Sequence, residues 1–167
     1  MHINILAVLA ATLVPIVMGF IWYNPKTLGG AWMREAGVTR EMMQGKSMAL
    51  VFVLSFVFSF MLAFAMQMIV IHQVHFASML MHHQQELKDT TQGLGATYKD
   101  IMDKYGNEFR TFKHGALHGF MASVFVILPV IAINAMFERK SWKYIWISWG
   151  YWAISFLVMG GIISCWP

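Results

Sequence analysis

Long apolar stretches separated by polar segments dominate the pattern of the chain. Four such stretches cover approximately residues 3–23, 47–71, 114–137 and 141–166. Each of them reaches the roughly 20 residues that an α-helix needs to cross a bilayer. The pattern therefore predicts an all-α integral membrane protein whose four transmembrane helices form two hairpins. We expect these hairpins to belong to a single domain over residues 1–167.

The polar segment between the second and third spans, residues 72–113, is expected to lie outside the membrane. Apolar residues at helical spacing continue past Ile71 to about Leu87, so we expect the second span to project from the membrane as one continuous helix. A further apolar stripe between Tyr98 and Tyr105 is typical of a helix at the membrane surface. These patterns predict a long, partly helical extramembrane loop.

Glycine, proline and threonine residues indicate where shorter elements begin, end and bend. A helix is expected at the membrane surface from Gly29 to Ala36, with Gly37 ending it and Thr39 capping the next helix. Pro15 and Pro129 lie inside predicted spans. Because proline has no N–H group to donate, each of them is expected to bend its helix.

Small side chains recur every four residues in three of the predicted spans, and such ridges let helices approach closely in lipid. The predicted helix-packing residues are Ala7, Ala11, Pro15, Gly19, Ser55, Ser59, Gly115, Gly119 and Ser123. A leucine at Gly19 or Gly119 is expected to separate the packed helices. Self-association through the ridges would make the protein a homo-oligomer or a subunit of a larger membrane complex.

Two amide side chains, Asn134 and Gln67, lie inside predicted spans. An amide buried in lipid requires hydrogen-bond partners. Both residues are therefore candidates for a buried polar site that binds a ligand or lines a permeation path. The alternative is that each amide forms a hydrogen bond between neighbouring helices. Both interpretations stay open on the sequence alone.

Composition supports the membrane class and limits the partners. Hydrophobic residues make up 58% of the chain and charged residues 12%, where a soluble domain carries about 25% charged residues. The lipid is therefore the expected solvent and partner, and bound lipid is expected. The net charge of +4 does not indicate nucleic acid, because no segment is expected to combine clustered basic residues with exposed aromatic ones. The lone Cys165 excludes an intramolecular disulfide and a cysteine-based metal site.

The positive charges predict an orientation. The first and third loops together carry seven lysine and arginine residues, and the opposite side carries five. Loops rich in basic residues stay in the cytoplasm, so we expect both termini and the loop at residues 72–113 to face outward.

All the histidines are expected on that outward side: His2, His72, His75, His82, His83, His114 and His118. Imidazole nitrogens suit zinc and copper. Any metal site is expected to consist of His72, His75, His114 and His118, because these residues mark the two ends of the long loop at one membrane level. His82 and His83 are expected to be solvated. The alternatives are histidines that are simply tolerated at the interface, or that form hydrogen bonds between helices.

No catalytic residues are predicted. The interiors of the spans lack Asp, Glu, Lys and Arg, which argues against ion-coupled transport and against chemistry inside the membrane. Nothing in the sequence assembles the carboxylates of the long loop into a site. We therefore do not expect an enzyme.

Several motifs resemble those of an uncharacterised bacterial membrane family known as domain of unknown function 1761. They are Gly19–Pro25 (GFIWYNP), Gly30–Met33 (GAWM), Phe112–Gly119 (FKHGALHG), Pro129–Arg139 (PVIAINAMFER), Ser141–Tyr144 (SWKY) and Gly150–Trp152 (GYW). The resemblance covers nearly the whole chain and departs most at about residues 72–92, which are longer and richer in histidine. It implies four helices in a bacterial inner membrane. It implies no activity and no functional residues.

Three hypotheses about function follow from these patterns. The first is a small inner-membrane protein that works as an oligomer or as a subunit of a larger assembly. The second is a metal- or proton-handling protein that uses the outward histidines. The third is a carrier or channel for a small apolar or lipid-like molecule.

Overall fold

The computed structural model describes residues 4–43 and 47–166. Three residues of the predictions lie outside the described ranges. They are His2 of the predicted histidine group, Ile3 of the first predicted span and Lys46 of the first predicted loop. All regular secondary structure in the described ranges is helical. Four helical segments are long and apolar enough to cross a membrane. The predicted fold class is thereby confirmed, and the chain is a multi-pass membrane protein.

Each of the candidate spans begins at a side-chain N-cap, which satisfies backbone N–H groups that the helix itself leaves unpaired. The spans are α1 (Ile5–Trp22), α4 (Met48–Val70), the segment Phe112–Phe137 and α9 (Trp142–Cys165). Their capping residues are Asn4, Ser47, Thr111 and Ser141. The short side chains that start the spans are therefore part of the sequence signal that positions them.

The third span is not a uniform helix. It consists of α7 (Phe112–Ala122), a π-helical segment η3 (Ser123–Ile127) and α8 (Leu128–Phe137). Pro129 is the second residue of α8, just after the π-helical segment. It has no N–H group to donate to a carbonyl of the preceding turn, so the ladder of hydrogen bonds is interrupted at this point. The Trp149 indole N–H donates to the Ser123 carbonyl at 3.0 Å, so α9 braces this irregular turn.

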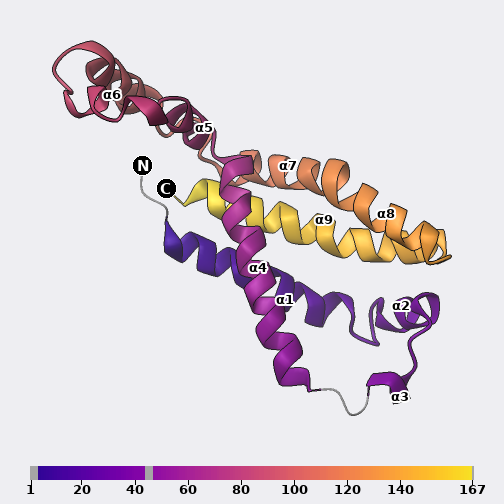
Figure 1. Ribbon diagram of the computed structural model, residues 1–167. Helices are drawn as coiled ribbons and strands as arrows, with labels where there is room; N and C mark the ends of the chain where they lie inside the picture. Colours follow the sequence, from indigo (N-terminus) through magenta and orange to yellow (C-terminus); the bar gives the residue numbers. More distant parts are fainter. Residues whose placement is uncertain (1–3, 44–46, 167) are drawn as a thin grey trace.

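The third span and α9 run side by side, and α1 and α4 pack against them (Figure 1). Glycines make the contact between α7 and α9 a contact between backbones. A Cβ atom at Gly115 would overlap the Gly160 carbonyl oxygen, and one at Gly119 would overlap the Phe156 carbonyl oxygen. The apolar core next to this contact includes Met66 and Met159, which are almost fully buried.

The first loop contains α2 (Gly29–Ala36) and α3 (Arg40–Met43). The predicted helix from Gly29 to Ala36 is confirmed, and Gly37 ends it with a φ of 72°. The Ser141 hydroxyl donates to Glu35 Oε2 at 2.6 Å, which ties α2 to the start of α9. This hydrogen bond, and then Lys143 Nζ at 3.4 Å, lower the pKa of Glu35 below its usual range. The carboxylate therefore stays charged at neutral pH.

The long loop contains α5 (His72–Met79), the 3₁₀ turns η1 (Met81–His83) and η2 (Glu86–Lys88), and α6 (Gly93–Tyr105). These elements extend away from the bundle at the end where α1 begins and α9 ends (Figure 1).

The expectation of one continuous helix from the second span to about Leu87 is wrong. Helix α4 ends at Val70, and Ile71 adopts an extended conformation before α5 begins. The β-branched residues at this point hold a helix weakly. The Gln73 amide also donates to the Glu108 carbonyl at 2.9 Å, which holds α5 against the end of the loop. Tertiary contacts therefore break the helix that the apolar spacing predicts.

Candidate metal centre

Three histidines from opposite ends of the long loop meet at the membrane surface. His72 is the first residue of α5, and His114 and His118 lie one turn apart near the start of α7. Each residue offers a ring nitrogen, and these nitrogens all lie within 4.8 Å of one another. The three residues form what we call the histidine cluster.

The imidazole rings of the cluster contact one another directly. The Nε2 atoms of His72 and His114 are 2.9 Å apart. The ring centroids of His114 and His118 are 4.5 Å apart, and those of His72 and His118 are 5.2 Å apart. The cluster is therefore already assembled by the fold.

The break at Ile71 places His72 in the cluster. Ile71 is 5% exposed and anchors the junction in the core, while its extended backbone turns α5 away from the direction of α4. A continuous helix would carry His72 onward along the axis of α4. The break that the sequence pattern did not predict is thus what brings His72 to His114.

The sequence HGALHG, residues 114–119, positions the other two histidines. Residues four apart share one face of a helix, so this spacing produces a ridge of histidines beside a ridge of glycines. Gly115 and Gly119 are buried against the backbone of α9. This contact sets the rotation of α7 about its axis, and the rotation turns His114 and His118 toward His72.

Phe109 covers one side of the cluster. Its ring centroid lies 4.9 Å from that of His114 and 5.7 Å from that of His72. Its backbone adopts a φ of 63°, a conformation that costs free energy for a residue with a bulky side chain. The Ser164 hydroxyl donates to the Phe109 carbonyl at 3.2 Å and helps to hold this turn. Hydrophobic periodicity does not identify a residue that covers a site from a turn, and no role was predicted for Phe109 from the sequence.

The ring nitrogens have a separation close to that of metal ligands. Two nitrogens bound to one tetrahedral zinc ion lie about 3.3 Å apart, because each Zn–N bond is about 2.0–2.1 Å long. The 2.9 Å between His72 and His114 is near this value, and small rotations of the rings would bring His118 to the same ion. Three neutral imidazoles form a ligand set that zinc and copper favour.

The structure brings together three of the four residues predicted for the metal site. His75 lies one turn further along α5, where its side chain is exposed, and it is not part of the described cluster. His82 and His83 are exposed as predicted. His83 Nδ1 lies 2.8 Å from Glu86 Oε1, in a surface pair apart from the cluster.

Most of the predicted helix-packing residues are buried between helices of this one chain: Ala7, Ala11, Pro15, Ser59, Gly115, Gly119 and Ser123. Gly19 and Ser55 are only partly buried, and both line a cavity between α1, α4 and α9. A Cβ atom at Gly19 would lie 3.9 Å from the Tyr151 hydroxyl, an ordinary contact distance. Gly19 therefore packs less tightly than Gly119, and the expected separation of the helices by a leucine at either position stays a prediction.

The two amides of the predicted buried polar site do not lie in one environment. Gln67 is 6% exposed, and its Nε2 donates weakly to the Phe64 carbonyl at 3.5 Å. Asn134 is exposed on the outer surface of α8 in the single chain. Helical spacing shows which residues share a face, but it does not show which face a neighbouring helix covers.

Comparisons with known proteins identify a family but no function. A family model described as a protein of unknown function, DUF1761, matches residues 6–164. This match confirms the resemblance that the sequence motifs indicated. No curated protein and no solved structure matches the chain.

Proposed function

We propose that this chain, which belongs to the DUF1761 family of proteins of unknown function, binds a zinc or copper ion at the membrane surface. The supporting observation is the histidine cluster, whose three ring nitrogens lie within 4.8 Å of one another. The ligands would be His72, His114 and His118. Two of them come from one rigid helix and the third from the opposite end of the long loop.

The composition of the cluster supports an exchangeable ion. Three histidines leave one position of a tetrahedral ion open to water or to another ligand, whereas a structural zinc site is closed by four protein ligands. His72 is exposed, while His114 and His118 are partly buried. The ion would therefore have one side toward water and the other toward the bundle. We propose that the protein accepts or delivers a metal ion rather than using it to hold the fold.

Metal titration of the purified protein tests this proposal. The protein, stripped with a chelator in detergent, is titrated separately with Zn²⁺ and Cu²⁺ against a chromophoric chelator. We expect one ion per chain. Replacing both His114 and His118 by alanine should weaken binding by more than the roughly 10–100-fold that changes around a metal site cause. Replacing both His75 and His83 is the matched control, because these exposed histidines lie outside the cluster.

Two results would contradict a metal site. One is a wild-type protein that binds neither ion. The other is a His114/His118 variant that binds as tightly as the His75/His83 variant. Melting temperatures of the variants show whether any loss of binding reflects unfolding.

We further propose a bacterial inner-membrane location, with the histidine cluster on the outer side. The distribution of basic residues along the sequence supports this orientation. The cluster would then meet metal ions before they cross the membrane.

Assembly is a second candidate function, and Asn134 supports it. Its amide is exposed on α8 amid exposed apolar side chains, and none of the described residues bonds it. An amide both donates and accepts hydrogen bonds, so two copies of one helix satisfy each other. We propose that α8 pairs with α8 of a second copy through Asn134.

Dissociation measured by energy transfer between labelled chains in vesicles tests this pairing. Interhelical hydrogen bonds contribute about 0.6–2 kcal/mol, so Asn134→Val should raise the dissociation constant about 3–30-fold. Ile133→Val is the control on the same helix, since it changes an exposed apolar side chain and no hydrogen bond. Equal dissociation constants for the two variants, or a wild-type chain that stays monomeric at every density, would exclude this interface.

A further inference from the structure

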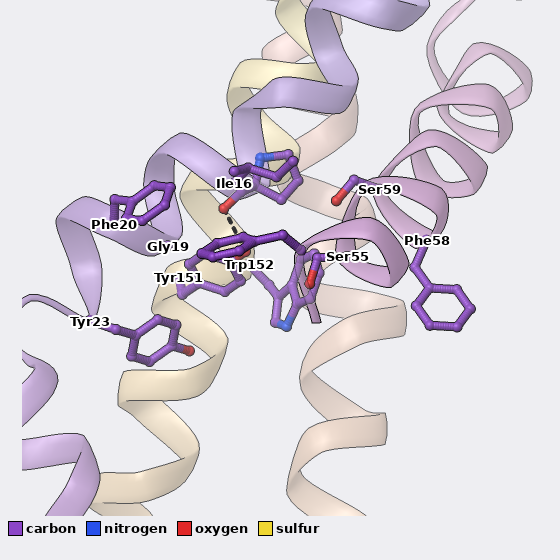
Figure 2. Close-up of a pocket in the computed structure, with 11 residues that line it drawn as sticks. Ile16, Gly19, Phe20, Tyr23, Ser55, Phe58, Ser59, Tyr151 and Trp152 are labelled. Carbon is purple, nitrogen blue, oxygen red and sulfur yellow. Dashed lines mark hydrogen bonds between the residues drawn. The ribbon is translucent and has the colours of Figure 1, made fainter. Parts of the chain in front are cut away.

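A cavity of about 400 Å³ opens between α1, α4 and α9, and it lies apart from the histidine cluster. Its volume falls within the range of ligand pockets, about 300–1,000 Å³. Most of its wall is apolar. The lining residues are Pro15, Ile16, Gly19, Phe20, Tyr23, Phe52, Ser55, Phe58, Ser59, Tyr151 and Trp152 (Figure 2).

Three hydroxyl groups in this cavity, those of Ser55, Ser59 and Tyr23, have no hydrogen-bond partner among the described residues. Ser55 and Ser59 lie one turn apart on α4, on the side that lines the cavity (Figure 2). A hydroxyl in a transmembrane helix normally donates to a carbonyl of the preceding turn. The Thr12 hydroxyl donates to the Val8 carbonyl at 2.8 Å, and the Ser155 hydroxyl donates to the Tyr151 carbonyl at 2.8 Å. Ser55 and Ser59 are therefore available to a ligand.

The Tyr151 hydroxyl, the fourth in the cavity, is already engaged. Tyr151 donates to the Pro15 carbonyl at 2.8 Å, which fixes the ring of Tyr151 across the cavity (Figure 2). A ligand would thus meet the rigid phenol face of Tyr151 and the free hydroxyls of Ser55, Ser59 and Tyr23. The free hydroxyls favour a ligand that carries a hydrogen-bond acceptor.

The walls of the cavity are rich in aromatic rings. Phe20 and Phe52 stack with ring centroids 5.6 Å apart. The rings of Tyr151 and Trp152 are 4.8 Å apart, and Tyr23 packs 5.2 Å from Tyr151. Aromatic rings pack favourably against the faces and edges of other rings. The cavity therefore favours a flat ring over a flexible hydrocarbon chain.

The position of Ser55 and Ser59 along α4 limits which kinds of ligand can reach them. Ser55 lies about 12 Å along α4 from its capping residue, and Ser59 about 18 Å, at 1.5 Å per residue. The ester groups of phospholipids lie at the edges of the hydrocarbon core, which is about 30 Å thick. An acceptor that reaches both serines must belong to a molecule dissolved in the hydrocarbon itself.

We infer that the cavity binds a lipid-soluble molecule with a flat ring bearing carbonyl groups, the chemical class of the benzoquinones. The ring would lie among the aromatic side chains, and a carbonyl oxygen would accept hydrogen bonds from Ser55 and Ser59. This site is independent of the proposed metal centre, because the two share no residue.

A matched pair of small molecules tests the inference. Duroquinone and durene carry the same four methyl groups on a six-membered ring, and only duroquinone has carbonyl oxygens. Saturable quenching or enhancement of tryptophan fluorescence of the purified protein reports the binding of each. Two hydrogen bonds of ordinary strength predict that duroquinone binds about 5–100-fold more tightly than durene.

Variants of the chain distinguish the contribution of the hydrogen bonds to binding from that of the apolar wall. Replacing both Ser55 and Ser59 by alanine should weaken duroquinone binding to the level of durene and leave durene binding unchanged. Gly19→Leu should exclude both molecules, because its side chain would enter the cavity. Ser148→Ala is the control, since Ser148 is a buried, unpaired serine that does not line the cavity.

The inference is overturned if duroquinone and durene bind equally, because the cavity would then be a site for hydrocarbon alone. It is also overturned if the Ser55/Ser59 variant keeps the preference for duroquinone, or if the wild type binds neither molecule. Retained durene binding by the serine variant shows that the cavity is still folded. None of these results bears on metal binding.

Discussion

Arg110 closes the carboxyl end of a transmembrane helix from a distant point in the chain. Its Nε donates to the Ser164 carbonyl at 2.8 Å, and Nη2 donates to the Trp166 carbonyl at 3.1 Å. The last carbonyls of a helix have no partner within the helix, and a positive charge there also favours the helix dipole. The side chain is partly buried, and its loss would leave these carbonyls unpaired at the membrane surface.

Replacing Arg110 by alanine should therefore destabilise the protein by about 1.5–3 kcal/mol, the range for hydrogen bonds with a charged partner. The stability of Arg110→Lys should lie between that of the wild type and that of Arg110→Ala. Lysine keeps the charge but lacks the planar group that reaches several carbonyls. Unfolding in mixed detergent micelles measures the free energy of unfolding of each variant. Lys113→Ala removes an exposed cation nearby and serves as the control. An Arg110→Ala protein as stable as this control would show that solvent alone satisfies the end of α9.

Helix α7 uses its two ridges for different purposes. Gly115 and Gly119 approach the backbone of α9, while His114 and His118 lie on the neighbouring face within the histidine cluster. In lipid, such close approach is the main source of attraction between helices, because water does not drive them together. The packing of the glycine ridge therefore determines the geometry of the histidine ridge.

A leucine at Gly119 should disrupt both the packing and the cluster, because its Cβ atom would overlap the Phe156 carbonyl. Overpacking of this kind costs typically 1–3 kcal/mol and displaces backbones. We expect a lower melting temperature and weaker metal binding. Gly19→Leu is the matched comparison, since the side chain there enters a cavity instead of a backbone contact. If the Gly19 variant loses as much stability as the Gly119 variant, the distinction between these two glycines is wrong.

The whole molecule has its two candidate sites at different levels of the bundle. The histidine cluster lies at the end from which α5 and α6 project, and the cavity lies between α1, α4 and α9, toward the end of α1 that leads into α2 (Figure 1). The histidine cluster therefore lies beside the long loop, and the cavity lies between candidate membrane spans.

Cysteine labelling in intact cells tests which end faces outward. With Cys165 replaced, Thr97→Cys on α6 should react with a membrane-impermeant maleimide before lysis, because its side is poorer in basic residues. Glu138→Cys lies in the turn between α8 and α9 and should react only after lysis. The reverse pattern for the two positions would place the histidine cluster in the cytoplasm.

Local sequence patterns predicted the fold class, the four candidate spans and the helix from Gly29 to Ala36. These features depend on local properties: apolar length, capping side chains and residues that end helices. A bilayer makes such signals strong, because only a helix of sufficient length satisfies its own backbone in lipid. The spacing of the histidines also pointed to three of the residues that meet, His72, His114 and His118.

Tertiary structure decided the rest. The break at Ile71 depends on contacts of Gln73 with a distant part of the chain, which no local pattern contains. The same break brings His72 into the cluster and leaves His75 in solvent. The exposure of Asn134 and the cavity beside Gly19 likewise depend on which face of each helix a neighbour covers. Periodicity defines the faces of a helix, but only the packing of the other helices determines what each face contacts.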